Sequence, residues 1–154
     1  MHASLPAMDR IEDCISFLTG KAAQAVSRAA RDRLAPHGVT PVQYAVLQVL
    51  WEHDGLNGVE IGQRLVLDSA TATGVIERLV KQGLVVRRPD PRDRRVNRLS
   101  STPAAEALRP VLQAEMAALN QDVRALLGAG AVRLWPLLRQ LAGLSPTDPE
   151  HTGP

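Results

Sequence analysis

Residues 68–100 read DSATATGVIERLVKQGLVVRRPDPRDRRVNRLS, and the spacing of their apolar residues changes within this stretch. As far as Gln82 the apolar residues recur at helical spacing, with Asp68 or Ser69 as the cap and Gly83 as the stop. Beyond Gly83 the pattern is extended: residues 84–87 and 96–100 are predicted strands, and residues 89–94 are the turn between them. The stretch predicts a helix followed directly by a β-hairpin.

Two further helices are predicted just before this stretch. Residues 58–65 form a short helix, separated by a tight turn from the one that begins near Ser69. Thr40 followed by Pro41 is a typical helix start, and this helix extends to about His53. Two short helices at a tight turn, followed at once by a basic hairpin, predict a winged helix-turn-helix with a two-stranded β wing.

Long helices are predicted on both sides of this lobe. An apolar stripe indicates a helix over residues 8–34, and Thr102 with Pro103 begins a helix that reaches about Leu127. Pro110 should bend or break that helix, and a last helix covers residues 131–142. The fold class is mainly α, in one domain over residues 1–154. The lobe takes residues 40–100, terminal helices take residues 8–35 and 102–143, and residues 144–154 form a flexible tail.

The positive charge of the chain is local. The 154 residues carry a net charge of only +2, but residues 78–98 hold eight Lys or Arg against two Asp. This segment therefore has a net charge of +6, and the rest of the chain has −4. Such a concentration indicates a polyanionic partner at one surface, although a solvated basic face is the alternative.

Several functional classes lack the residues that they need. Cys14 is the single cysteine, and His2, His37, His53 and His151 are scattered along the chain, so neither a metal site nor a cofactor site is expected. No convergent acid, base or nucleophile points to an enzyme. The sequence has no run of 18 apolar residues and no signal peptide, so a cytoplasmic protein with no membrane partner is expected.

The helix that begins near Ser69 has two distinct faces. Ala72, Val75, Ile76 and Leu79 share one face and should pack inward. Gly74, in mid-helix, costs about 1 kcal/mol relative to Ala, which close approach to a DNA groove would explain. The alternative is a poorly optimised surface helix, and Glu77 would be repelled by phosphates unless it pairs with Lys81 or accepts from a cytosine. The residues expected to contact DNA are Ser69, Ala70, Thr71, Thr73, Gly74 and Arg78.

The hairpin turn concentrates arginine around one carboxylate. A guanidinium at the tip of a wing can enter a narrow minor groove, where the negative potential is strongest. We expect Arg95 to do so, with Asp93 orienting it through a charge-assisted, possibly bidentate, hydrogen bond. Arg92, Arg94 and Arg98 would then contact nearby phosphates.

The segment LVLDSATATGVIERLVKQGLVVRRPDPRDRR resembles the core signature of the MarR family of bacterial regulators, with its D-x-R wing, and GVTPVQYAVLQVLWE is similar to the family's second helix. After Leu99 the sequence SSTPAAE departs from the family's usual Leu-Thr and glycine. The resemblance implies a homodimer, joined by the terminal helices, that binds a pseudo-palindromic site in double-stranded DNA. The apolar residues of those helices exceed what one small domain can bury, which also favours a dimer.

Regulators of this family usually repress genes until a signal releases them from DNA. Two kinds of signal are possible here, a small ligand and oxidation of a thiol. A small aromatic acid could bind at Cys14, Phe17, Lys21 and Arg28, with Lys21 or Arg28 holding its carboxylate. GKAAQ together with APHGVTPVQYAVLQVLWE resembles the subgroup of the family that controls nicotinate breakdown, and this resemblance implies a hydroxylated nicotinate as the effector. Alternatively, the family's organic-hydroperoxide sensors carry a reactive cysteine at the position that Cys14 matches. A winged helix can also act purely as a protein-interaction module, and salt-sensitive DNA binding would distinguish the two classes.

Overall fold

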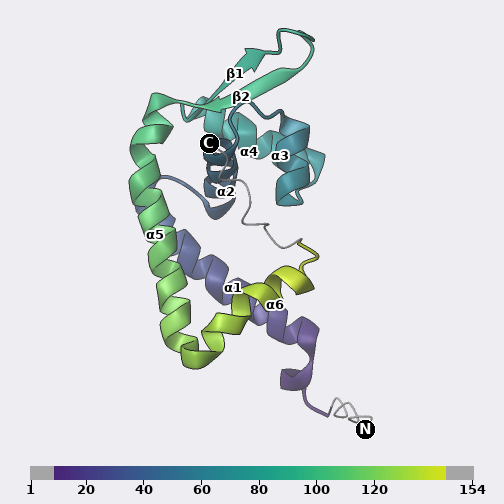
Figure 1. Cartoon of the computed structure of the whole chain (residues 1–154), viewed down its shortest axis with the longest axis vertical. Helices are drawn as coiled ribbons and strands as arrows, with labels where there is room; N and C mark the ends of the chain where they lie inside the picture. Colours follow the sequence, from purple (N-terminus) through teal and green to yellow (C-terminus); the bar gives the residue numbers. More distant parts are fainter. Residues whose placement is uncertain (1–8, 145–154) are drawn as a thin grey trace, which may run out of the picture. The chain divides into compact units, whose positions relative to one another are not determined.

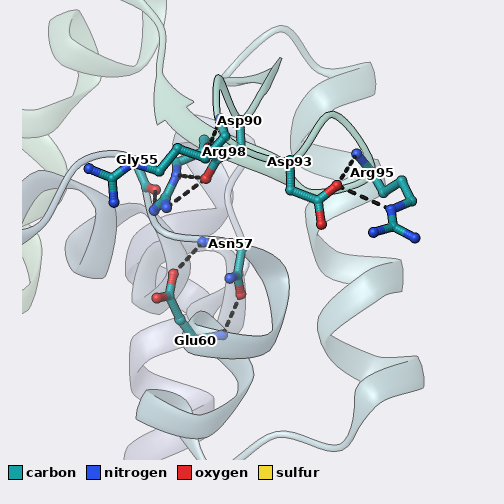
Figure 2. A network of polar contacts seen from close by, with 8 residues as sticks. Gly55, Asn57, Glu60, Asp90, Asp93, Arg95 and Arg98 are labelled. Atoms are coloured by element: carbon teal, nitrogen blue, oxygen red, sulfur yellow. Dashed lines mark hydrogen bonds and ion pairs between the residues drawn. The ribbon is translucent and has the colours of Figure 1, made fainter.

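The helices of the winged lobe begin at residues that cap them. The computed structural model describes residues 9–144. Helix α2 (Pro41–Glu52) begins after Thr40, whose hydroxyl accepts from the Gln43 amide while the Gln43 side chain accepts from the Thr40 amide. Helix α3 (Gly58–Leu65) has the same reciprocal cap, formed by Asn57 and Glu60 (Figure 2). Both caps pair backbone amides that a helix start otherwise leaves unsatisfied.

The recognition-type helix and the wing follow as predicted. Helix α4 covers Ser69–Lys81, and Asp68 caps it by accepting from the Thr71 amide at 2.8 Å. Strands β1 (Val85–Pro89) and β2 (Asn97–Ser101) pair antiparallel, with Val85 opposite Ser101 and Pro89 opposite Asn97 (Figure 1). The predicted first strand starts one residue too early. The Leu84 amide donates to the Leu79 carbonyl and so closes α4 instead of joining the sheet.

The core of the lobe joins α2, α3, α4 and the wing. All four residues predicted to face inward from α4, namely Ala72, Val75, Ile76 and Leu79, are buried. Val75, Ile76 and Leu79 belong to one hydrophobic cluster with buried side chains of the other elements, among them Leu47, Leu50, Ile61 and Leu99. Because the inner face of α4 is fixed by this packing, its opposite face is turned to solvent.

The long helices differ from prediction at two points. Residues 11–13 form a short 3₁₀ turn (η1) and α1 covers Ile15–Leu34, so the start predicted at Met8 is wrong for residues 9–14. Extended dihedral angles at Cys14 separate the two elements, and Met8 itself lies outside the described residues. Helix α5 (Pro103–Leu127) continues through Pro110, so the predicted early break does not occur. One missing amide is tolerated because helical turns continue on both sides of it.

The chain consists of two compact units, and the boundary between them lies within α5. The first unit ends at Met116. In this unit a short 3₁₀ turn, η2 (Ala35–His37), follows α1. The Glu115 carboxylate of α5 accepts a hydrogen bond from the Arg33 guanidinium of α1 at 3.2 Å. The second holds the end of α5, η3 (Gly128–Gly130) and α6 (Ala131–Leu141), where the Arg124 guanidinium lies 4.6 Å from the Trp135 ring centre. The predicted tail falls largely outside the described residues. Over residues 9–144, no helix is long and apolar enough to cross a membrane.

Candidate nucleic-acid interface

The outer face of α4 carries small and hydroxyl-bearing side chains. Ser69, Ala70, Thr71 and Thr73 are exposed, and a Cβ added at Gly74 would meet nothing within 4 Å. Nothing in the described part of the chain therefore requires glycine at position 74. The Thr71 hydroxyl donates to Asp68 at 2.7 Å, so it takes part in the cap and keeps only its lone pairs for other contacts. Glu77, Arg78 and Lys81 are exposed farther along the helix.

At the wing tip, one carboxylate oxygen of Asp93 accepts two hydrogen bonds from Arg95. Asp93 Oδ1 accepts from the Arg95 backbone amide at 3.1 Å and from Arg95 Nε at 3.2 Å (Figure 2). The contact thus uses one oxygen, whereas the sequence also suggested a bidentate pair. The Arg95 side chain is 91% exposed, and Arg92 and Arg94 are exposed beside it. The tip presents three guanidinium groups to solvent, one of them with its stem restrained.

The start of the wing turn contains an ion pair that sequence reasoning missed. Asp90 is only 6% exposed, and its carboxylate accepts from the Arg92 amide and from Arg98 Nε, both at 2.7 Å. Arg98 also donates from Nη1 to the Gly55 carbonyl at 3.0 Å (Figure 2). Two backbone hydrogen bonds join Leu99 to Gly55 and Leu56, so the wing is tied to the loop before α3.

From the sequence, Arg98 was predicted to contact DNA phosphates. In the structure its guanidinium instead donates to Asp90 and to the Gly55 carbonyl. We therefore treat Arg98 as the residue that anchors the wing, and its contact with DNA stays a prediction. The sequence did contain a signal for Asp90. An Asp at the start of a Pro-containing turn commonly accepts from the backbone two residues later, and the bond from Arg92 follows this pattern.

Acid should loosen the start of the wing turn. The Arg92 amide, and then Arg98, hold the pKa of Asp90 below its ordinary value. A carboxyl whose folded pKa is depressed stabilises the fold above its unfolded pKa of about 3.9, and this stabilisation is lost as pH falls through the folded value. As pH falls through that lowered value, we expect NMR to show smaller protection factors, relative to intrinsic exchange, for the amide of Arg92 and the Nε–H of Arg98. Asp90→Asn should remove this acid transition; an unchanged transition would assign it to another group, such as Asp68.

The residues predicted to bind an effector lie along α1, but they do not form one cluster. Cys14 precedes α1, and its Sγ lies 3.2 Å from Ser16 Oγ, a hydrogen bond that lowers the pKa of the thiol. Lys21 Nζ lies 5.7 Å from the ring centre of Phe17. Arg28 is two helical turns farther on, at a shallow recess of about 320 Å³ that is otherwise lined by Ala23, Gln24, Ser27 and Arg31.

The geometry of a capped recognition-type helix beside an arginine-rich wing agrees with the sequence comparison. Residues 39–96 match the model of the MarR family. The chain belongs to the MarR family. The chain is similar to the HTH-type transcriptional regulator TtmR of Methylorubrum extorquens. The two are 46% identical over 85 residues, which cover 55% of this chain and 44% of TtmR. The organic hydroperoxide resistance transcriptional regulator of Bacillus subtilis is 31% identical, over 60% of this chain and 63% of that protein.

Solved structures extend the likeness to the MarR fold as a whole. CouR of Rhodococcus jostii, a transcriptional repressor solved with a 23-mer DNA duplex, is 26% identical with a TM-score of 0.82, over 90% of this chain and 99% of CouR. BpsR of Bordetella bronchiseptica, whose DNA binding is regulated by 6-hydroxynicotinic acid, is 25% identical with a TM-score of 0.81, over 88% and 98%. The matched part of this chain spans about half the length of the curated relatives. The family consists of transcriptional regulators rather than enzymes.

Proposed function

We propose that this MarR-family chain is a sequence-specific DNA-binding repressor, working in the cytoplasm and released from its operator by a small aromatic carboxylate. The observation that carries the DNA-binding part is the position of exposed Arg95, which lines one hollow with the first residues of α4, while Arg92 and Arg94 are exposed in the same turn. Helix α4 would enter the major groove and Arg95 the adjacent minor groove. The residues assigned to DNA are Ser69, Ala70, Thr71, Thr73, Gly74, Arg78, Arg92, Arg94 and Arg95, with Arg98 anchoring the wing.

The proposal includes a homodimer. Large apolar side chains are exposed on α1, among them Ile15, Leu18 and Val26. In the second unit, the same holds for Leu126, Val132, Leu137, Leu138 and Leu141. Surfaces of this kind are buried in protein interfaces, and a two-fold axis would place the two α4 helices about 34 Å apart, one turn of the duplex.

Removing the carboxylate at the wing tip tests the role of Asp93. We expect Asp93→Ala to weaken operator binding about three- to tenfold, because the free Arg95 side chain then loses more conformational entropy on binding. Arg95→Ala should weaken binding at least as much, and the double variant no further than Arg95→Ala alone. Fluorescence anisotropy with labelled operator measures all three. Equal affinity of Asp93→Ala and wild type would remove the orienting role.

The proposed effector is supported by structural relatives and by cations on α1. BpsR responds to 6-hydroxynicotinic acid, and CouR was solved with p-coumaroyl-CoA. In this chain Lys21 or Arg28 would hold the carboxylate, and Phe17 offers an apolar surface beside Lys21. Adding 6-hydroxynicotinate to the protein–operator complex should release DNA from wild type. Whichever of Lys21→Ala and Arg28→Ala no longer responds to the compound identifies the anchor. Continued binding at saturating compound would exclude this effector.

A second candidate signal is oxidation of Cys14. The lowered pKa of its thiol increases the thiolate fraction, which is the reactive form, and one relative is an organic hydroperoxide regulator. Cumene hydroperoxide should then release DNA from wild type and not from Cys14→Ser. Release from both proteins would show that damage elsewhere, and not Cys14, causes the effect.

A further inference from the structure

An open hollow of about 940 Å³ lies between the α3–α4 turn and the wing. Its walls come from α3, from the turn, from the first residues of α4 and from the wing residues Arg95, Val96 and Asn97. All of these residues belong to the first compact unit. Of the lining residues, Ser69, Thr73 and Arg95 were predicted from the sequence to contact DNA, whereas Val59 and Val66 were assigned no role.

Two exposed valines line the hollow, and one of them has an unfavourable backbone conformation. Val66 has φ 54° and ψ 46°, and within residues 9–144 it is the one residue other than glycine with a positive φ. Left-handed conformations are strongly disfavoured for β-branched residues, whereas Gly or Asn adopts them readily. Val66 is also 81% exposed and Val59 69% exposed. Neither packing nor backbone geometry in the free lobe accounts for a valine at position 66.

The residues that line the hollow around the two valines indicate the class of partner that would bind there. Arg95 supplies positive charge at one wall, while Ser69, Thr73, Gln63 and Asn97 supply neutral hydrogen-bonding groups. Asp68 is also in the lining, but its carboxylate is occupied by the Thr71 amide and hydroxyl. A mixture of apolar, neutral polar and cationic groups matches a sugar–phosphate strand, which alternates deoxyribose carbons with charged phosphates.

The docking geometry leads to the same partner. If α4 occupies the major groove and the wing tip the adjacent minor groove, the strand that separates the two grooves must pass between them. The hollow lies between these two elements. We propose that it receives this sugar–phosphate strand, with Val59 and Val66 packed against deoxyribose carbons. The inference rests on the proposed DNA-binding function and adds contacts that depend on the shape of the strand rather than on its charge.

The test combines three measurements on Val66→Asn. Asn tolerates a left-handed conformation, so the melting temperature should stay at or above that of wild type. Operator affinity of the full-length protein should fall about five- to tenfold, because an apolar contact with DNA is lost. The slope of log affinity against log salt should not change, because no phosphate contact is removed. Arg95→Ala is the matched contrast and should reduce that slope.

Val59→Thr, which replaces one methyl group with a hydroxyl of similar size, is the second variant and should weaken binding in the same way. Affinities of both variants within twofold of wild type would overturn the inference. A lower melting temperature of Val66→Asn, with full affinity for Val59→Thr, would also overturn it, because Val66 would then serve the turn alone. If wild type fails to bind DNA in a salt-dependent way, the proposed function fails instead.

Discussion

Gly74→Leu should abolish operator binding and at the same time stabilise the free protein. Leu is favoured over Gly in a helix interior by roughly 0.8 kcal/mol, and the site has open space for a side chain. A leucine there would project from the exposed face of α4 and hold the helix away from the groove floor. We expect affinity to fall at least about 100-fold, close to non-specific binding, while urea denaturation shows a more stable protein.

A graded series separates steric exclusion from other effects. Gly74→Ala should stabilise the free protein at least as much as Gly74→Leu, because Ala has the higher helix propensity. It should cause a smaller loss of affinity, because a single methyl group intrudes less. Gly20→Ala, at an exposed position in the middle of α1, is the matched control: it should stabilise its helix and leave DNA binding unchanged. If Gly74→Leu bound the operator as tightly as wild type, α4 would not lie in the groove.

Leu141→Glu should separate the proposed dimer. Leu141 is 63% exposed near the end of α6, and a charge placed in a buried apolar interface remains unpaired. Sedimentation velocity should show a monomer at micromolar concentration. Operator affinity should fall by about 10² to 10⁴, because two linked lobes bind two half-sites far more tightly than one lobe binds its own.

Gln140→Glu introduces the same charge at the neighbouring exposed position and serves as the control. It should remain a dimer with near wild-type affinity. Circular dichroism of Leu141→Glu should still show helical protein, since the side chain is exposed in the single chain. A dimer of unchanged stability in Leu141→Glu would place the interface away from α6.

Local sequence signals were sufficient for most of the fold. The caps at Thr40 and Asp68 and the stop at Gly83 located α2 and α4 within a residue, because their hydrogen bonds involve only nearby residues. Pro110 shows where such signals fail. A proline interrupts one hydrogen bond, but whether the helix ends there depends on the many bonds and contacts on either side.

The candidate site was predicted less completely than the fold. The contact of Asp93 with Arg95 spans two residues and follows from local geometry. Arg98 could not be placed from sequence, because its partners are Asp90, which follows the opposite strand, and Gly55, 43 residues away. The exposed, left-handed Val66 gave no sequence signal, because valine normally argues against that conformation.

The most direct test of the account is a salt titration of DNA binding. The full-length protein would be titrated by fluorescence anisotropy against a duplex from the region upstream of its own gene, with a shuffled duplex of equal composition. We predict specific binding of a dimer, with log affinity falling against log salt at a slope of about −5, as expected if the exposed tip arginines of two wings, roughly six cations, displace counterions from DNA. Equal affinity for both duplexes, or a slope near zero, would contradict a sequence-specific DNA-binding regulator.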